Sequence, residues 1–232
     1  MSTSNPKRID TPLDAAIWLQ YFKAQNFSLL EKLNLKSLNK YTWSLREHTN
    51  VGDSLMSIVE HGINRIKHAC DCMAVLLKEL KLNSELGHCR LLVCSEKANA
   101  FYEPSRLLLP DRSIATVDDI TIARAFKKFF KKDWKNGACV VTVLKLWGPF
   151  NVNHLSDYPK ALLTDEGFQD FDPFLPIEVE KYSEKELQSC LDYYKEKNWL
   201  QRPVSKTKEA HEEIKFLSGM NPGQVYNICS EL

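Results

Sequence analysis

The sequence has little glycine and proline, no long apolar run and no excess of charge of either sign. Its 232 residues include 8 Gly and 10 Pro, which excludes collagen-like and low-complexity chains. No stretch approaches the ~18 uncharged apolar residues of a transmembrane helix, so no membrane insertion is expected. Lys+Arg number 31 and Asp+Glu 30, a net charge of +1, which excludes a globally basic protein that coats nucleic acid but not a local basic face. With 44% hydrophobic residues, we expect a folded chain of one large or two modest domains.

Targeting and disulfide signals are also lacking. The first twenty residues have no apolar core of a secretory signal and make a poor mitochondrial presequence. The cysteine count is odd, and most cysteines lie in apolar runs, which favours reduced core thiols over a disulfide framework. The seven are Cys70, Cys72, Cys89, Cys94, Cys139, Cys190 and Cys229. Cys70 and Cys72 form the one close pair, but zinc sites favour CxxC spacing with a second half, so we predict no metal site.

The common catalytic and nucleotide-binding motifs are absent too. The sequence contains no G-x-x-x-x-G-K-[ST] phosphate-binding loop, no G-x-G-x-x-G, no G-x-S-x-G and no H-E-x-x-H. None of the histidines lies in a nucleophile motif, so they are expected on the surface or on helix faces. They are His48, His61, His68, His88, His154 and His211. We predict no catalytic residues and no enzyme activity.

Three long helices are expected in the first part of the chain. Thr11, Pro12 and Asp14 are typical of a helix start, and Leu13, Ile17, Tyr21 and Ala24 would share its apolar face. A 3.6-residue apolar period extends from 53 to 81 and predicts the longest helix. Another helix is expected over 116–134, with an aromatic stripe along one side.

Short apolar runs at 89–96, 138–144 and 174–179 predict strands, and their alternation with helices favours a parallel sheet. Residues 145–173, between the second and third predicted strands, are expected to form a loop. The carboxyl-terminal part carries helix signals alone: a capping box from Ser183 to Glu186, a helix over 207–218 closed by Gly219, and a last start at Asn221. The fold class predicted is α/β, with an α/β domain over 1–180 and a helical unit over 181–232.

Two surface features could carry function. The first strand ends at Glu96, as a Walker B strand ends in an acid that holds magnesium, although many buried strands end this way without a role. The helix over 116–134 carries a basic face that includes Lys127, Lys128, Lys131 and Lys132. Such a cluster fits contacts with RNA phosphates or an acidic protein, and it equally fits a solvated helix face.

Several segments resemble the carboxyl-terminal region of the death-associated protein 3 family of mitochondrial small-subunit ribosomal proteins. The resemblance runs in order from about residue 8 to the end of the chain, and the segments of the last 62 residues are the most specific. The segments are PLDA (12–15), VLLKEL (75–80), DWKNGA (133–138), FDPFLPIEV (171–179), KYSEKELQSC (181–190), YYKEKNWL (193–200) and FLSGMNP (216–222).

The resemblance implies a fold and a place of action. It implies a partial P-loop NTPase sheet of the AAA-like type, a helical carboxyl-terminal unit, and a non-catalytic structural role in the mitochondrial small ribosomal subunit. Partners would be other small-subunit proteins and rRNA, and no small-molecule substrate is implied. Members of the family bind GTP with magnesium, but the phosphate-binding loop lies upstream of the segment that matches Arg8, so no cofactor is expected for this chain.

The sequence also departs from the family pattern. At the Walker B position the family has an acid followed by glycine, whereas this chain has Glu96 followed by Lys97, and the lysine could neutralise the acid. The alternative functions are a GTP-binding or GTP-hydrolysing apoptosis-related protein and a cytosolic binding module. We therefore keep Glu96 as a degenerate nucleotide-site position and the four lysines as the RNA- or partner-binding candidates. Sequence alone does not decide whether Met1 is the biological start.

Overall fold

The computed structural model describes residues 8–109, 111–144 and 158–230. The chain divides into two compact units, Met1–Phe174 and Leu175–Leu232. The first unit combines helices with a small parallel sheet and the second is helical, so the fold is of the mixed α/β kind. In the described ranges, no helix is both long and apolar enough to cross a membrane.

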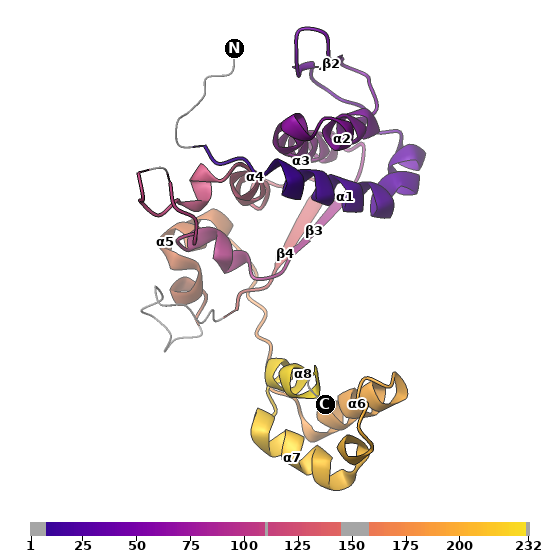
Figure 1. Cartoon of the computed structure of the whole chain (residues 1–232), viewed down its shortest axis with the longest axis vertical. Helices are drawn as coiled ribbons and strands as arrows, with labels where there is room; N and C mark the ends of the chain where they lie inside the picture. The colour runs from indigo at the N-terminus through magenta and orange to yellow at the C-terminus, as the bar shows by residue number, and fades with distance from the viewer. Residues whose placement is uncertain (1–7, 110, 145–157, 231–232) are drawn as a thin grey trace. The chain divides into compact units, whose positions relative to one another are not determined.

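Four helices form the core of the first unit: α1 (Pro12–Leu33), α2 (Leu55–Asn64), α3 (Ala69–Glu85) and α4 (Thr121–Phe129). Helix α3 contacts each of the other three, and α1 also packs on α2 (Figure 1). The helices approach closely at Gly62, where an added Cβ would lie 2.5 Å from Cδ1 of Leu19 and 2.8 Å from Cβ of Cys72. Only glycine fits there without displacing core side chains.

The single helix predicted over 53–81 is wrong. Helix α2 ends at Asn64, the backbone leaves the helical region at Arg65 (φ −122°, ψ 75°), and the short 3₁₀ helix η1 (Ile66–His68) leads into α3. Both helices bury their apolar residues in one core, so the apolar spacing continues across the turn. The break therefore leaves no trace in the apolar period.

The apolar face predicted for the first helix is also wrong. Leu13, Ile17 and Tyr21 are exposed, whereas Ala15 and Leu19 are buried. The side that carries small alanine side chains packs on the core, because alanine lets neighbouring helices approach closely. The helix begins at Pro12 as expected, but the Thr11 side chain makes no capping hydrogen bond.

The sheet consists of two parallel strands, β3 (Leu91–Ser95) and β4 (Gly137–Val141), paired in register with Val93 opposite Cys139. This confirms the first two predicted strands and their parallel arrangement. One face packs on the helical core, and the other leaves Leu92 and Val140 68% and 53% exposed. Parallel sheets are almost always covered on both faces, so an open apolar face is unusual for a sheet of this kind.

Three other expectations, for segments between residues 116 and 179, need correction. The helix expected over 116–134 is the 3₁₀ turn η3 (Val117–Asp119) followed by α4, which ends at Phe129. Part of the predicted loop is helix α5 (Pro159–Phe171), and its remainder, 145–157, lies outside the described residues. Residues 174–179 form no strand with any described residue, and Ile177 is 78% exposed. An apolar alternation needs a partner strand to become a ladder.

A short hairpin and a 3₁₀ helix complete this unit. Strands β1 (Tyr41–Thr42) and β2 (His48–Thr49) pair antiparallel, with Tyr41 opposite Thr49. Helix η2 (Ala98–Tyr102) follows β3, and its buried Asn99 extends the sheet edge. The Asn99 side chain donates to the carbonyl of Leu144 at 2.7 Å and accepts from its amide at 3.1 Å.

The carboxyl-terminal unit contains α6 (Glu184–Glu196), the 3₁₀ helix η4 (Pro203–Lys206), α7 (Lys208–Ser218) and α8 (Pro222–Ser230). The three helices expected from its start and stop signals are confirmed, and α7 ends at Gly219 in the left-handed conformation (φ 54°). Its core is small and aliphatic: Leu187, Leu191, Leu200, Ile214 and Val225. Phe216 and Leu217 are exposed, because they lie on the outer side of α7.

The capping box of α6 is confirmed. The hydroxyl of Ser183 accepts from the Glu186 amide at 3.3 Å, and the Glu186 carboxylate accepts from the Ser183 amide at 2.8 Å. Both bonds satisfy amides that a helix start otherwise leaves without partners.

We expect Ser183→Ala to destabilise α6 by about 1 kcal/mol, because the cap is lost. Hydrogen exchange measured by mass spectrometry on α6 peptides should then be about fivefold faster. Ser189→Ala is the matched control, since that hydroxyl donates only to the Lys185 carbonyl within the helix and its removal should change little. Equal exchange in Ser183→Ala and the parent would contradict the capping account.

Candidate functional site

The lysines of α4 do not form one solvent-exposed basic face. Lys127 is 5% exposed, and its ammonium donates to Asp118 at 3.1 Å and to Glu166 at 2.6 Å. It also lies 5.1 Å from the centroid of the Tyr102 ring. Burial lowers the pKa of Lys127, but the two carboxylates raise it by more, so this pKa lies above its ordinary value. The expectation of a solvated Lys127 is therefore wrong: it joins η3, η2 and α5.

Of the other three lysines, Lys128 lies in the last turn of α4, and Lys131 and Lys132 follow the helix. Lys131 pairs with Asp170 at 3.1 Å, and Lys132 donates to the carbonyl of Asp172 at 2.5 Å. Lys128 is exposed and has no ion pair among the described residues. Lys128 and Lys132 are thus the two of the four whose charge no described carboxylate neutralises, and an RNA or partner contact of these lysines stays a prediction.

The aromatic stripe of this region belongs to the core. Phe129 and Phe130 are buried, and Phe126 and Trp134 pack against the same cluster. Cys70 and Cys72 are likewise buried in α3. Burial raises the pKa of Cys72 to about 12, so this thiol stays protonated and behaves as a small apolar group.

Glu96 lies directly after the carboxyl end of β3, where the sequence placed it. Its side chain is 77% exposed, and the Lys97 ammonium lies 3.6 Å from its carboxylate. Lys97 adopts the left-handed conformation (φ 56°), and its amide donates to the hydroxyl of Thr142 at 3.1 Å. A carboxylate paired with a lysine attracts a cation less strongly than a free carboxylate does. A nucleotide role for Glu96 stays a prediction.

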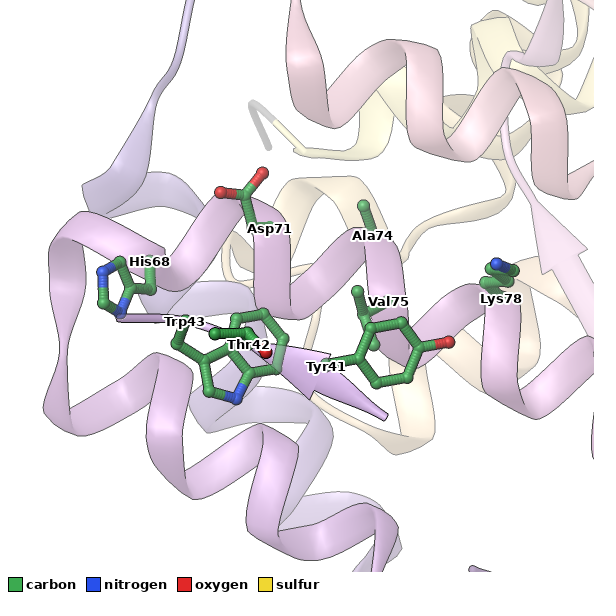
Figure 2. Close-up of a pocket in the computed structure, with 8 residues that line it drawn as sticks. All are labelled: Tyr41, Thr42, Trp43, His68, Asp71, Ala74, Val75 and Lys78. Atoms are coloured by element: carbon green, nitrogen blue, oxygen red, sulfur yellow. The ribbon is translucent and has the colours of Figure 1, made fainter. Parts of the chain in front are cut away.

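An aromatic groove lies between the β1–β2 hairpin and α3, and no pattern in the sequence predicts it. Its volume is about 390 Å³, and it is lined by Tyr41, Thr42, Trp43, His68, Asp71, Ala74, Val75 and Lys78. Figure 2 shows the rings of Trp43 and Tyr41 between His68 at one end and Lys78 at the other. The two rings are near-parallel, with centroids 6.0 Å apart. The Tyr41 hydroxyl bonds Glu79 of α3 and the Trp43 ring stacks on His61 of α2, so both side chains hold the hairpin to the helices.

The hairpin is fixed by the fully buried carboxylate of Glu79 in α3. That carboxylate accepts from the Leu38 amide at 2.7 Å, the Asn39 side chain at 2.9 Å and the Tyr41 hydroxyl at 2.6 Å. Burial, and then the bond to Glu79, raise the pKa of Tyr41 above its ordinary value, so Tyr41 remains a donor. A buried carboxylate without such donors would be strongly destabilising.

Glu47, His61 and His68 form a group whose side chains could hold a metal ion, since one ligand atom of each lies within 4.8 Å of the others. Burial lowers the pKa of His61, which favours the neutral imidazole. A hydrogen bond from Arg65 lowers the pKa of Glu47, which favours the carboxylate. The three come from the hairpin, from α2 and from η1, so no local sequence motif announces them.

Comparisons with known proteins agree along the whole chain. The family model described as mitochondrial ribosomal death-associated protein 3 matches residues 1–227. The small ribosomal subunit protein mS29 of Bos taurus is 40% identical over 231 residues, which span all of this chain and 57% of the bovine protein. The mouse protein of the same name, from Mus musculus, is 37% identical over 231 residues and is covered to 58%. The chain thus spans a little over half the length of these two relatives.

The ion pairs of Lys127 predict that this residue contributes more to the stability of the first unit than its neighbour Lys128 does. We expect Lys127→Ala to lower the free energy of unfolding by about 1–3 kcal/mol, because it removes a buried stem and leaves two carboxylates without their cation. Lys128→Ala, the matched control, should stay within about 0.5 kcal/mol of the parent. Urea unfolding followed by tryptophan fluorescence in a Trp199→Phe background reports the first unit. Equal midpoints for the two variants would contradict the assignment.

Proposed function

Because the chain belongs to the mitochondrial ribosomal death-associated protein 3 family, we propose that it is a structural component of the mitochondrial small ribosomal subunit. The observation that carries the proposal is the match along the whole chain to two mammalian proteins named small ribosomal subunit protein mS29. Its place of action would be the mitochondrion, and its partners would be other components of the small subunit.

The exposed face of the sheet supports a role inside an assembly. Leu92 and Val140 carry apolar side chains into solvent from strands that natural proteins normally cover on both sides. Exposed apolar faces of this kind are typical of surfaces that another chain or segment covers. We interpret β3 and β4, joined through α4, as part of a P-loop-type α/β fold, and we propose that the remaining cover of the sheet is supplied in the assembled particle.

The proposed role is non-catalytic. The sequence has no G-x-x-x-x-G-K-[ST] loop to supply the backbone donors and the lysine that bind a nucleotide's phosphates. The acid at the end of β3, Glu96, is paired with Lys97. In this role the chain contributes shape and charge, and Lys128 and Lys132 are the residues we assign to contact with rRNA or a neighbouring protein.

Sedimentation of the endogenous chain tests the proposal. With an epitope tag at its carboxyl end, the chain should co-sediment with the small subunit in sucrose gradients of mitochondrial lysate. The same fractions should contain small-subunit rRNA. A chain that stays at the top of the gradient, or that fractionates outside mitochondria, would overturn the proposal.

A variant arm of this experiment tests the contact residues. Lys128→Glu combined with Lys132→Glu should weaken co-sedimentation and flatten its salt dependence by about one unit of log–log slope for each phosphate that the chain no longer binds. Lys185→Glu combined with Lys208→Glu makes the same change of charge on exposed residues of α6 and α7 and serves as the control. Equal weakening in both double variants would point to net charge rather than to this surface.

A further inference from the structure

The turn between α2 and α3 brings two histidines together. His61 lies near the end of α2 and His68 at the end of η1, and Nε2 of His61 lies 3.0 Å from Nδ1 of His68. The ring planes differ by 15°. In a continuous helix, residues seven apart would be separated by about 10.5 Å along the axis. The break at Arg65 is therefore what creates this pair.

A carboxylate completes the group. Glu47 lies on the loop of the β1–β2 hairpin, where the Trp43 amide donates to its carbonyl at 2.9 Å. Arg65 donates to one of its carboxylate oxygens at 2.8 Å, and the Ser44 hydroxyl donates to the other at 3.2 Å. The Trp43 ring packs against His61, with centroids 5.3 Å apart. The hairpin thus orients both the carboxylate and one imidazole.

We propose that Glu47, His61 and His68 form a binding site for a divalent zinc-type cation. Two imidazole nitrogens and one carboxylate oxygen are a ligand set that zinc accepts, with the fourth position left to water. The three side chains are half-buried, which leaves that fourth position within reach of solvent.

The imidazole pair needs only a small adjustment, whereas the ligand atoms of the whole group lie within 4.8 Å of one another, so the carboxylate must draw closer to the rings. Zinc–nitrogen bonds of 2.0–2.1 Å place two tetrahedral ligands about 3.3 Å apart, so the two rings must separate by a few tenths of an ångström. The hydrogen-bonded pair alone accounts for the 3.0 Å distance between the ring nitrogens, because one neutral imidazole can donate to the other. The ion pair with Arg65, at 2.8 Å, holds the Glu47 carboxylate beside this pair of rings, and a bound cation would share that carboxylate with Arg65. The bound metal would join the hairpin, α2 and η1 at one point.

Zinc titration of the purified chain tests the site. The probe is Zn²⁺ followed by calorimetry, in a Cys94→Ser background that removes the exposed thiol. We expect one ion per chain with a dissociation constant in the micromolar range or tighter, and at least tenfold weaker binding in His61→Gln and in His68→Gln. His48→Gln changes an exposed histidine of the same hairpin and should bind as the parent does. Absence of saturable binding below about 100 µM would overturn the proposal.

Two further measurements distinguish loss of the site from loss of the fold and from metal binding by cysteines. Glu47→Gln is nearly isosteric and should also weaken binding at least tenfold, so it decides the question if a histidine variant fails to fold by circular dichroism. With Co²⁺ as the probe, a site of imidazole and carboxylate ligands should show no thiolate charge-transfer band. Such a band would assign the metal to cysteines, and Zn²⁺ binding that survives all three substitutions would assign it to other residues; either result would overturn the proposal. The titration uses the isolated chain, so its failure would leave the ribosomal proposal untouched.

Discussion

The hydrogen bonds to the buried carboxylate of Glu79 are the interactions on which the aromatic groove and the β1–β2 hairpin depend. Helix α3 contacts α1, α2 and α4, and Glu79 uses this rigid support to fix the Leu38 amide and the Tyr41 hydroxyl. A buried charge is tolerated only when such donors surround it. The hairpin thereby acquires a fixed position, and with it the groove, the Trp43 ring and the carboxylate of Glu47.

Local physics makes part of this fold predictable from sequence. The capping box at Ser183 and Glu186, the glycine stop at Gly219 and the apolar strand runs depend on neighbours a few residues away. Features that distant contacts decide were not predictable. The break at Arg65 preserves the apolar period on both sides, and the burial of Lys127 depends on Glu166, 39 residues later. The extended 174–179 segment shows that alternation predicts a strand only when a partner strand is present.

The candidate sites also differ in how far they could be predicted from sequence. Glu96 was found from sequence because a strand end is a local feature, whereas Glu47, His61 and His68 were not, because three separate elements meet there. The family resemblance supplied what the residues alone could not: membership of the mitochondrial ribosomal death-associated protein 3 family, which the match along the chain shows, and from which the ribosomal role is proposed. The structure adds a physical reason, since a two-stranded parallel sheet with an apolar outer face suits a chain that is covered by neighbours.

The accessibility of Cys94 tests this central claim most directly, because Cys94 is exposed in β3 on the open face of the sheet. Alkylation by a small maleimide, mapped by peptide mass spectrometry, would be compared between the free chain and intact mitochondrial small subunits. The account predicts rapid labelling of Cys94 in the free chain and protection in the particle, while the buried Cys72 stays unlabelled in both. Equal labelling of Cys94 in the two states would show that the assembly leaves this face open and would contradict the account.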